Sequence, residues 1–460
     1  MRIRLDSIGC RLNIGEAEAL ARQLARRGHR IVGTGEAADL FIFNTCAVTH
    51  LAARKSRKLI RHLRRANPDS AVVVTGCYAE LSPEDVEELG VDLVVGNREK
   101  DRLPAVLERN GFLRDSDPIP AIDATPFSPA DALPIARDSV ASGEVEAGGA
   151  PAAGSRTRAF VKVQDGCDNR CTFCIVTVAR GAARSRPLPE VVAEIRDLVG
   201  AGYQEAVLSG VHLGAYGHDR PSEGGLEELI RQILAETEVP RLRLSSLEPW
   251  DLNVAFFELW EDPRLLPHLH LPLQSGCDAT LQRMARRTTQ EEFAALVDAA
   301  RAAIPDLAVT TDLMVGFPGE TEEEFSQSLE FVARMELAKL HVFRYSAREG
   351  TVAASMPEQV PVQVAQLRSQ QMHALGAEMQ RTYQRRFLGR EMAVLWETPE
   401  VREDSVVWSG LSGNYLRIAT RTAPEADLRN KVIPARVTGE IPGGLAAETE
   451  YSVDTAATGT

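Results

Sequence analysis

Gly166-Cys167-Asp168-Asn169-Arg170-Cys171-Thr172-Phe173-Cys174 places three cysteines on one short stretch, with the spacing C-x3-C-x2-C. A cubane [4Fe–4S] cluster usually takes four protein ligands, typically cysteines. Three ligands leave one iron open, and an open iron can hold a substrate or a cofactor. The spacing therefore predicts a cluster that takes part in chemistry, rather than one that only stores electrons.

Spacing alone leaves a zinc site or a set of unligated cysteines as alternatives for this loop. Zinc sites usually come as two C-x2-C-like pairs. No second pair lies nearby, and His212 and His218 are far along the chain. Unligated cysteines would pack as small hydrophobic residues.

Composition bounds the class of protein. The chain has 460 residues, 44% of them hydrophobic and 25% charged, so we expect a globular protein with more than one core. The net charge of −13 argues against a protein that is basic all over, but a local basic patch can still bind nucleic acid. No apolar run reaches the about 18 residues of a membrane span, and the first residues lack a signal peptide. We expect a cytoplasmic protein with no membrane association.

Upstream of the loop, residues 1–113 alternate strand and helix patterns, which predicts an open parallel sheet. In such a sheet, ligands bind at the edge where the strands end. Three residues far apart in sequence can therefore converge there. The predicted strands and the cysteine that follows each are Ile3–Ile8 with Cys10, Leu40–Phe43 with Cys46, and Ala71–Thr75 with Cys77.

Three further regions follow. Residues 114–155 are rich in Ala, Pro, Gly and Ser, which predicts a flexible linker. Successive strand–helix units over residues 156–386 predict a partial or full (β/α) barrel. Short strands split by Gly, Pro and Asn over residues 387–455 predict a small β-barrel. The expected fold class is therefore α/β with a small C-terminal β-barrel.

The residues around the cysteines resemble those of the radical SAM methylthiotransferase family. Radical SAM enzymes share the C-x3-C-x2-C spacing, usually with an aromatic residue before the third cysteine, where this chain has Phe173. The N-terminal matches are Gly9-Cys10-Arg11-Leu12-Asn13, Asn44-Thr45-Cys46-Ala47-Val48-Thr49 and Thr75-Gly76-Cys77-Tyr78. The central matches are Arg158–Cys167, Cys174–Gly181, Leu271–Gly276, Thr311–Thr321 and His341–Thr351. One departure is Thr177-Val178, where the family commonly has Pro and an aromatic residue.

The resemblance implies a chemistry and a ligand set. It implies that Cys167, Cys171 and Cys174 are catalytic and hold a [4Fe–4S] cluster, whose open iron binds S-adenosylmethionine (SAM). Reduction of that cluster then yields a 5′-deoxyadenosyl radical, so a reducing electron donor is implied as a partner. It also implies that Cys10, Cys46 and Cys77 hold a second [4Fe–4S] cluster that delivers sulfur from a sulfur source. Cys277 has no cysteine neighbour and is expected to be a packed residue.

Polar and glycine residues at predicted strand ends are candidates for SAM binding, because that face of a barrel carries the site. Turn formation is the alternative for the glycines. The expected cofactor-binding residues are Phe173, Gly210, Ser246, Glu248, Gln274 and Gly316.

Two segments resemble one branch of the family, the branch that modifies N6-threonylcarbamoyladenosine next to the anticodon of tRNA. These are Ser209–Gly217 and Arg243–Pro249. The expected function is conversion of that nucleoside to its 2-methylthio derivative, with Arg180 or His212 as candidates for binding the carboxylate. Alternatives are methylthiolation of isopentenyladenosine tRNA or of a ribosomal protein. An alternative of another class is a non-catalytic RNA-binding iron–sulfur redox sensor.

Two basic regions are candidates for contacting tRNA. One is the predicted helix at about Ala52–Arg65, although a charged helix face is usually just solvated. The other is the C-terminal barrel, which resembles the TRAM module, a resemblance that implies RNA binding. Its cations are Arg417, Arg421, Arg429, Lys431 and Arg436.

Overall fold

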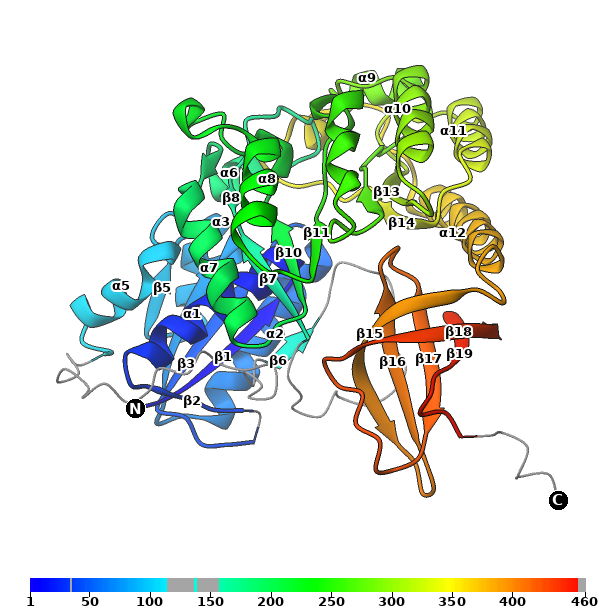
Figure 1. Ribbon diagram of the computed structural model, residues 1–460. Coiled ribbons are helices and arrows are strands. Elements are labelled where there is room, and N and C mark those ends of the chain that lie inside the picture. The colour runs from blue at the N-terminus through cyan, green and yellow to red at the C-terminus, as the bar shows by residue number, and fades with distance from the viewer. Residues whose placement is uncertain (34, 114–135, 139–156, 454–460) are drawn as a thin grey trace.

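The computed structural model describes residues 1–33, 35–113, 136–138 and 157–453, arranged in three parts. Figure 1 shows the N-terminal part in blue beside the central part, which runs from green to yellow. The C-terminal barrel, in orange and red, lies below the central part. The predicted linker, residues 114–155, lies outside the described residues except for the short strand β6 (Ala136–Asp138).

The N-terminal part is an open parallel sheet in the order β2-β1-β3-β4-β5, with β6 also paired to β1. Buried aliphatic and aromatic runs form its inner strands, as expected for a sheet covered on both faces. The strands are β1 (Arg2–Ile8), β2 (Arg30–Ile31), β3 (Leu40–Thr45), β4 (Ala71–Gly76) and β5 (Leu93–Val95). The helices are α1 (Arg11–Arg26), α2 (His50–Ala66), α3 (Cys77–Leu81), α4 (Pro83–Glu87) and α5 (Leu103–Arg109).

The central part is a partial barrel. One parallel sheet has the order β11-β10-β7 and a second has the order β12-β13-β14. An isolated bridge between Ser246 and His270 joins the two sheets. The strands are β7 (Arg158–Lys162), β10 (Glu205–Ser209), β11 (Arg241–Leu244), β12 (His268–His270), β13 (Ala308–Val315) and β14 (Lys339–Arg344), with the hairpin β8 (Gln164–Asp165) and β9 (Arg184–Ser185).

Helices cover the outside of the partial barrel and bury its main hydrophobic core. Two of them begin with a capping box, in which a threonine and a glutamate three residues later satisfy each other's backbone N–H groups: Thr289 with Glu292, and Thr321 with Glu324. The helices are α6 (Val176–Arg180), α7 (Leu188–Gly200), α8 (Leu226–Glu236), α9 (Asp278–Arg283), α10 (Gln290–Ala303), α11 (Glu322–Arg334) and α12 (Val362–Arg385).

Helix α1 packs closely on strand β7 and so joins the N-terminal part to the barrel. A Cβ atom at Gly15 would lie 2.8 Å from the carbonyl oxygen of Phe160, so any larger residue would push the two elements apart. This contact brings the start of α1, which follows Cys10, against the strand that leads to Cys167.

The C-terminal part is a closed barrel in the order β15-β16-β17-β19-β18. Beneath it, Glu205 of β10 is fully buried and paired with Arg241 at 3.0 Å and Arg243 at 2.7 Å. The same arginines donate hydrogen bonds to backbone carbonyls of the barrel, at Leu411 and Gly413. The barrel is therefore docked through buried charge. Its strands are β15 (Glu391–Val401), β16 (Val406–Ser412), β17 (Arg417–Thr422), β18 (Val432–Ile441) and β19 (Gly444–Glu448).

The sequence pattern in this barrel predicts a short strand at Tyr415–Ile418, whereas β17 begins at Arg417. Tyr415 instead occupies a turn with φ of +66°. Its ring stacks on His268 and lies under the guanidinium of Arg243. Although burial opposes the change, Arg11, Arg158 and Arg243 lower the pKa of Tyr415 to about 8. The turn places the phenol among cations from both other parts of the chain.

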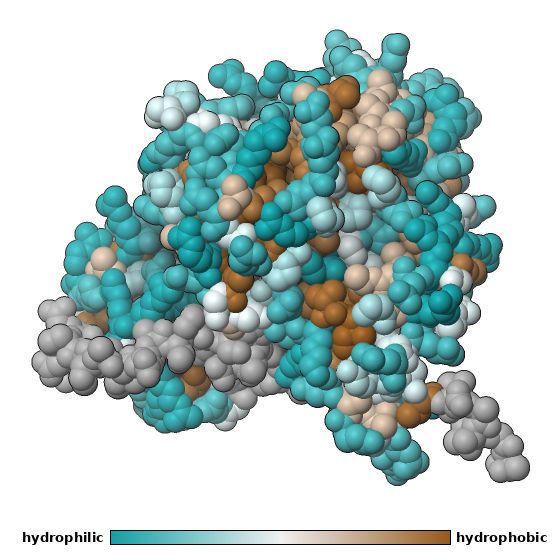
Figure 2. All heavy atoms as spheres, in the orientation of Figure 1, coloured by the Kyte–Doolittle hydropathy of each residue, from teal (hydrophilic) through white to brown (hydrophobic). Residues whose placement is uncertain are grey.

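Figure 2 shows a mostly hydrophilic face, with hydrophobic residues visible in gaps between helices and beside the barrel. None of the helices in the described part of the chain has the length and apolar character needed to span a membrane.

Candidate functional site

Cys10, Cys46 and Cys77 lie at the ends of the adjacent strands β1, β3 and β4. Cys10 is the N-cap of α1, Cys46 follows β3 directly, and Cys77 opens α3. The three thiols are free. Burial, and then the neighbouring Cys10 and Cys77, raise the pKa of Cys46 to about 12, so the three thiols lie close enough to interact. The sheet thus brings together three residues that are far apart in sequence.

Cys167, Cys171 and Cys174 lie on the loop between β8 and α6. Burial, and then contacts that include Cys171 and Cys167, raise the pKa of Cys174 to about 12. The loop begins at Gly166, whose φ is +71°. A Cβ atom there would lie 2.0 Å from the carbonyl oxygen of Ala182, so only glycine lets the chain turn at this point.

Each triad fits a cluster ligated by three cysteines. All of the donors are thiols, and thiolates are the soft ligands that iron–sulfur clusters require. Within the residues that the structure describes, no three His, Cys, Asp or Glu side chains are placed to share a single metal ion. Each ligand of a cubane binds a different iron, so three thiols can hold a cubane without meeting at one metal ion.

A buried ion network connects the two triads. Arg180, with a side chain 3% exposed, donates to Glu16 of α1 at 2.9 Å and to Asp165 at 2.9 Å. It also donates to the Asn13 side chain at 2.7 Å. Asn13 is three residues after Cys10, and Asp165 is two residues before Cys167. One guanidinium therefore links the two cysteine segments directly.

Glu16 is the centre of this network. Its side chain is 5% exposed and pairs with Lys100 at 2.5 Å and Lys162 at 3.4 Å, in addition to Arg180. Burial alone would raise the pKa of Glu16, but Arg180, Lys100 and Lys162 hold it well below the usual value. Glu16 is therefore ionised and ties the N-terminal sheet to β7 and α6.

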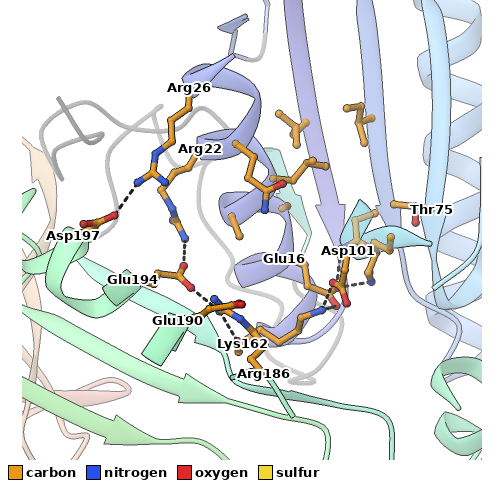
Figure 3. A pocket seen from close by; sticks show the side chains of 18 of the residues that line it. Glu16, Arg22, Arg26, Thr75, Asp101, Lys162, Arg186, Glu190, Glu194 and Asp197 are labelled. Carbon is orange, nitrogen blue, oxygen red and sulfur yellow. Dashed lines mark hydrogen bonds and ion pairs between the residues drawn. The ribbon is translucent and has the colours of Figure 1, made fainter. Parts of the chain in front are cut away.

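The same interface lines a partly open cavity of about 560 Å³ between the N-terminal sheet, α1 and α7. Figure 3 shows Glu16 and Lys162 on one side of it and two further ion pairs on the other. Those pairs join Arg22 to Glu194 at 2.8 Å and Arg26 to Asp197 at 3.1 Å. The cavity is thus bounded by ion pairs between the two parts of the chain.

The expected SAM-binding residues fall into two groups. Glu248 accepts hydrogen bonds from Arg286 at 2.6 and 3.3 Å, and Arg286 Nη1 lies 3.7 Å from the Sγ atom of Cys171. The Arg286 guanidinium lies over the ring of Trp250 at 4.4 Å. Glu248 is therefore held beside the cysteine loop, through an arginine that no sequence motif had singled out.

The remaining expected residues pack against, or form hydrogen bonds with, residues of the surrounding loops and turns. Phe173 packs edge to face on Phe317, within a small apolar cluster. The Gly316 N–H is taken by Glu320 at 2.7 Å. Gly210 lies against the Gln164 side chain. Gln274 is in a left-handed turn with φ of +76°, and Ser246 bridges to His270. These residues shape the rim of the partial barrel.

Neither residue suggested for binding the substrate carboxylate is free to do so. Arg180 is saturated by the buried network described above. His212 pairs with Asp251 at 2.5 Å and lies near Asn169 at 3.4 Å. Both expectations are corrected by these contacts.

Sequence reasoning missed the partners Asn13, Glu16, Asp165, Asp251 and Arg286. Asn13 and Glu16 lie three and six residues after Cys10, so both fall near one face of the helix that it caps. Acidic and amide residues on that face were the available signal. Cys277 is buried, as expected for a packed residue.

Each of the two cysteine-bearing parts of the chain matches the model of a known protein family. Residues 2–96 match the family model described as "Uncharacterized protein family UPF0004". Residues 161–332 match the Radical SAM superfamily. With the three-cysteine loop on a partial barrel, this defines the class: a radical SAM enzyme.

Relatives identify the family within that class. "Threonylcarbamoyladenosine tRNA methylthiotransferase MtaB" of Bacillus subtilis is 34% identical over 95% of this chain and 93% of its own length. The protein of the same name from Thermotoga maritima is 36% identical over 86% of each. "tRNA-2-methylthio-N(6)-dimethylallyladenosine synthase" of Cereibacter sphaeroides is 35% identical over 97% of this chain and 98% of its own length. The chain belongs to the radical SAM methylthiotransferase family, and its cofactors are an iron–sulfur cluster and SAM.

A solved structure supports the fold. The radical SAM methyltransferase TsrM from Kitasatospora setae aligns with a TM-score of 0.53 at 15% identity, over 77% of each chain. At that identity the likeness concerns the fold alone.

Proposed function

We propose that the chain is a tRNA methylthiotransferase that converts N6-threonylcarbamoyladenosine, next to the anticodon, to its 2-methylthio derivative. The observation that carries the proposal is the pair of cysteine triads, which come from two parts of the chain and are linked by Arg180. The relatives named for threonylcarbamoyladenosine tRNA support this choice of substrate.

Each triad has its own proposed role. Cys167, Cys171 and Cys174 hold one [4Fe–4S] cluster with SAM, and Cys10, Cys46 and Cys77 hold a second. When bound, these groups supply the radical that removes hydrogen from adenine C2, and the sulfur and methyl group that replace it. The network of Glu16 and Arg180 keeps the two triads at a fixed separation, so that one adenine can face both.

Further residues orient the cofactor and support the cysteine loop. Arg286 fixes the rotamer of Glu248 beside Cys171, and we place Glu248 among the contacts of SAM, with Gly210, Ser246, Gln274 and Gly316 forming the rim around it. Phe173 supports the cysteine loop by packing on Phe317.

We assign the methylthiotransferase role to residues 1–113, the radical chemistry to residues 156–386 and RNA binding to residues 387–455. The reaction needs an electron donor and a sulfur source as further partners. A tRNA substrate also implies that the protein works in the cytoplasm.

The test is a comparison of two substrates. Anaerobically reconstituted protein is incubated with SAM, reductant and sulfide, and with tRNA that carries either threonylcarbamoyladenosine or dimethylallyladenosine. Mass spectrometry of the nucleosides is expected to find the methylthio product of the first. A site that hydrogen-bonds the threonylcarbamoyl group should reject the apolar substrate by about 10⁴-fold.

A second candidate substrate comes from the relatives named for dimethylallyladenosine, which cover this chain as fully. Preference for dimethylallyladenosine tRNA in the same assay would select it. That result would leave the radical chemistry unchanged but would overturn threonylcarbamoyladenosine as the substrate.

A further inference from the structure

The segment 345–353, which follows β14, reaches both cysteine triads. On one side, the backbone N–H of Ala353 donates to the carbonyl oxygen of Thr172, between Cys171 and Cys174, at 2.9 Å. On the other side, the carbonyl oxygen of Ala347 lies 2.6 Å from Nε2 of His50, four residues after Cys46. A ligand placed between the triads therefore meets this segment.

Arg348 is the cation of this segment, and it is followed by the exposed Glu349. The Nη1 atom of Arg348 donates to Nδ1 of His50 at 3.2 Å. Because the Ala347 carbonyl requires the hydrogen of the imidazole on Nε2, Nδ1 is left as the acceptor. His50 thus fixes the orientation of the guanidinium without neutralising it.

Apart from His50, the group whose charge acts on this guanidinium is the Cys46 thiol, which raises the pKa of Arg348 against the larger, opposite effect of burial. The Nε atom of the guanidinium is buried and makes no hydrogen bond, and across the described residues no carboxylate lies within ion-pair distance of Arg348. A partly buried, unpaired cation is costly, and an anion that pairs with it relieves that cost. The Tyr345 hydroxyl, in the same segment, is a second buried donor without a partner.

We infer that Arg348 forms an oxyanion site for the RNA substrate, on the segment that contacts the loops of both triads. Nε and Nη2 lie on one edge of the guanidinium, and such an edge binds two oxygens of a phosphate or a carboxylate. The ligand is either a backbone phosphate beside the target adenosine or the carboxylate of its threonylcarbamoyl group. The inference rests on the proposed function, because that function supplies the RNA.

The neighbouring surface suits an unstacked loop of RNA. Val48 and Leu51 are 43% and 56% exposed on either side of His50, and Val352 is 61% exposed in the same segment. Apolar side chains can pack against a base that has left the stack. Arg348 would then fix the backbone or the modified base.

The experiment measures binding of anticodon stem-loop RNA to the reconstituted holoenzyme by fluorescence anisotropy. Arg348→Ala is compared with wild type and with Arg344→Ala, an exposed arginine at the end of β14, the strand that precedes this segment. Arg348→Lys keeps the charge but lacks the two-donor edge. We expect Arg348→Ala to weaken binding by at least about tenfold, Arg348→Lys to fall between it and wild type, and Arg344→Ala to have a smaller effect.

Two RNAs distinguish the two oxyanions. Equal weakening for stem-loops with plain adenosine and with threonylcarbamoyladenosine, with a salt slope lower by about 0.7, indicates a phosphate contact. Weakening only for the modified stem-loop indicates the carboxylate. Both results support the site.

Unchanged RNA binding by Arg348→Ala would overturn the inference. So would a loss of iron or an altered cluster EPR spectrum with RNA binding intact, because Arg348 would then serve the cluster. If wild-type protein binds neither RNA, the proposed function itself fails.

Discussion

Replacing Glu16 with glutamine tests the link between the two triads. The change keeps the size of the side chain but removes the charge that Lys100, Lys162 and Arg180 share. Asp165 would remain as the buried partner of Arg180. The variant therefore leaves an excess of positive charge in a buried interface.

The expected cost follows from burial. The side chains of Glu16, Lys100 and Arg180 are 5%, 5% and 3% exposed. Removing one partner of such a pair typically costs about 3–5 kcal/mol, because the remaining charge stays desolvated. Arg26 and Asp197 form a control pair at the same interface, with both side chains 57% exposed. Loss of an exposed pair costs about 0–1 kcal/mol.

The assay is hydrogen–deuterium exchange of the amides in α1 and β7, which reports local opening. A cost of about 3–5 kcal/mol corresponds to exchange faster by about 150- to 5,000-fold. Asp197→Asn should change the rates by less than about tenfold. Glu16→Gln should also form less methylthio product for each SAM cleaved, because the triads are no longer held together. Equal exchange rates in the two variants would refute this reasoning.

Three further predictions concern the barrel, its docking and the basic helix. Although burial opposes the change, Arg243, Arg241 and Arg158 lower the pKa of Glu205 from 4.5 to about 2, so stability is expected to fall by about 3 kcal/mol as pH drops from 4.5 to 2. Fluorescence of the buried barrel residues Trp396 and Trp408 would follow the unfolding, and Glu205→Gln should abolish this dependence of stability on pH. Deleting residues 390–460 should lower the melting temperature of the core and not only weaken RNA binding, because the deletion strips buried Arg241 and Arg243 of their carbonyl partners; a core that melts unchanged would oppose this. Replacing exposed Arg54, Lys58 and Arg61 of α2 with glutamine should weaken tRNA binding and lower its salt slope by about 2 to 3; an unchanged slope would make this helix face merely solvated.

The parallel architecture could be predicted because strand and helix periodicities alternate clearly. That pattern also placed Cys10, Cys46 and Cys77 at strand ends, and parallel strands end at one edge. A partial or full (β/α) barrel was predicted for the same reason. The motifs around the cysteines then led to the family.

The network between the triads could not be predicted. Glu16 and Arg180 are 164 residues apart, and no local pattern reveals that pairing. Arg180 was named, with His212, as a candidate for binding the substrate carboxylate, because its position after the cysteine loop is visible in sequence, whereas its burial is not. Tyr415 was predicted to begin a strand because short runs split by Gly, Pro and Asn suggest strands here, but its backbone is left-handed and its ring lies under Arg243.

The most direct test of the account compares two products in one reaction. Protein in which Cys10, Cys46 and Cys77 are replaced together with alanine is reconstituted and supplied with SAM, reductant and threonylcarbamoyladenosine tRNA. The account predicts about four irons in place of about eight, continued formation of 5′-deoxyadenosine, and no methylthio nucleoside. Methylthio product from this variant at the wild-type level would contradict the assignment of sulfur transfer to the N-terminal triad.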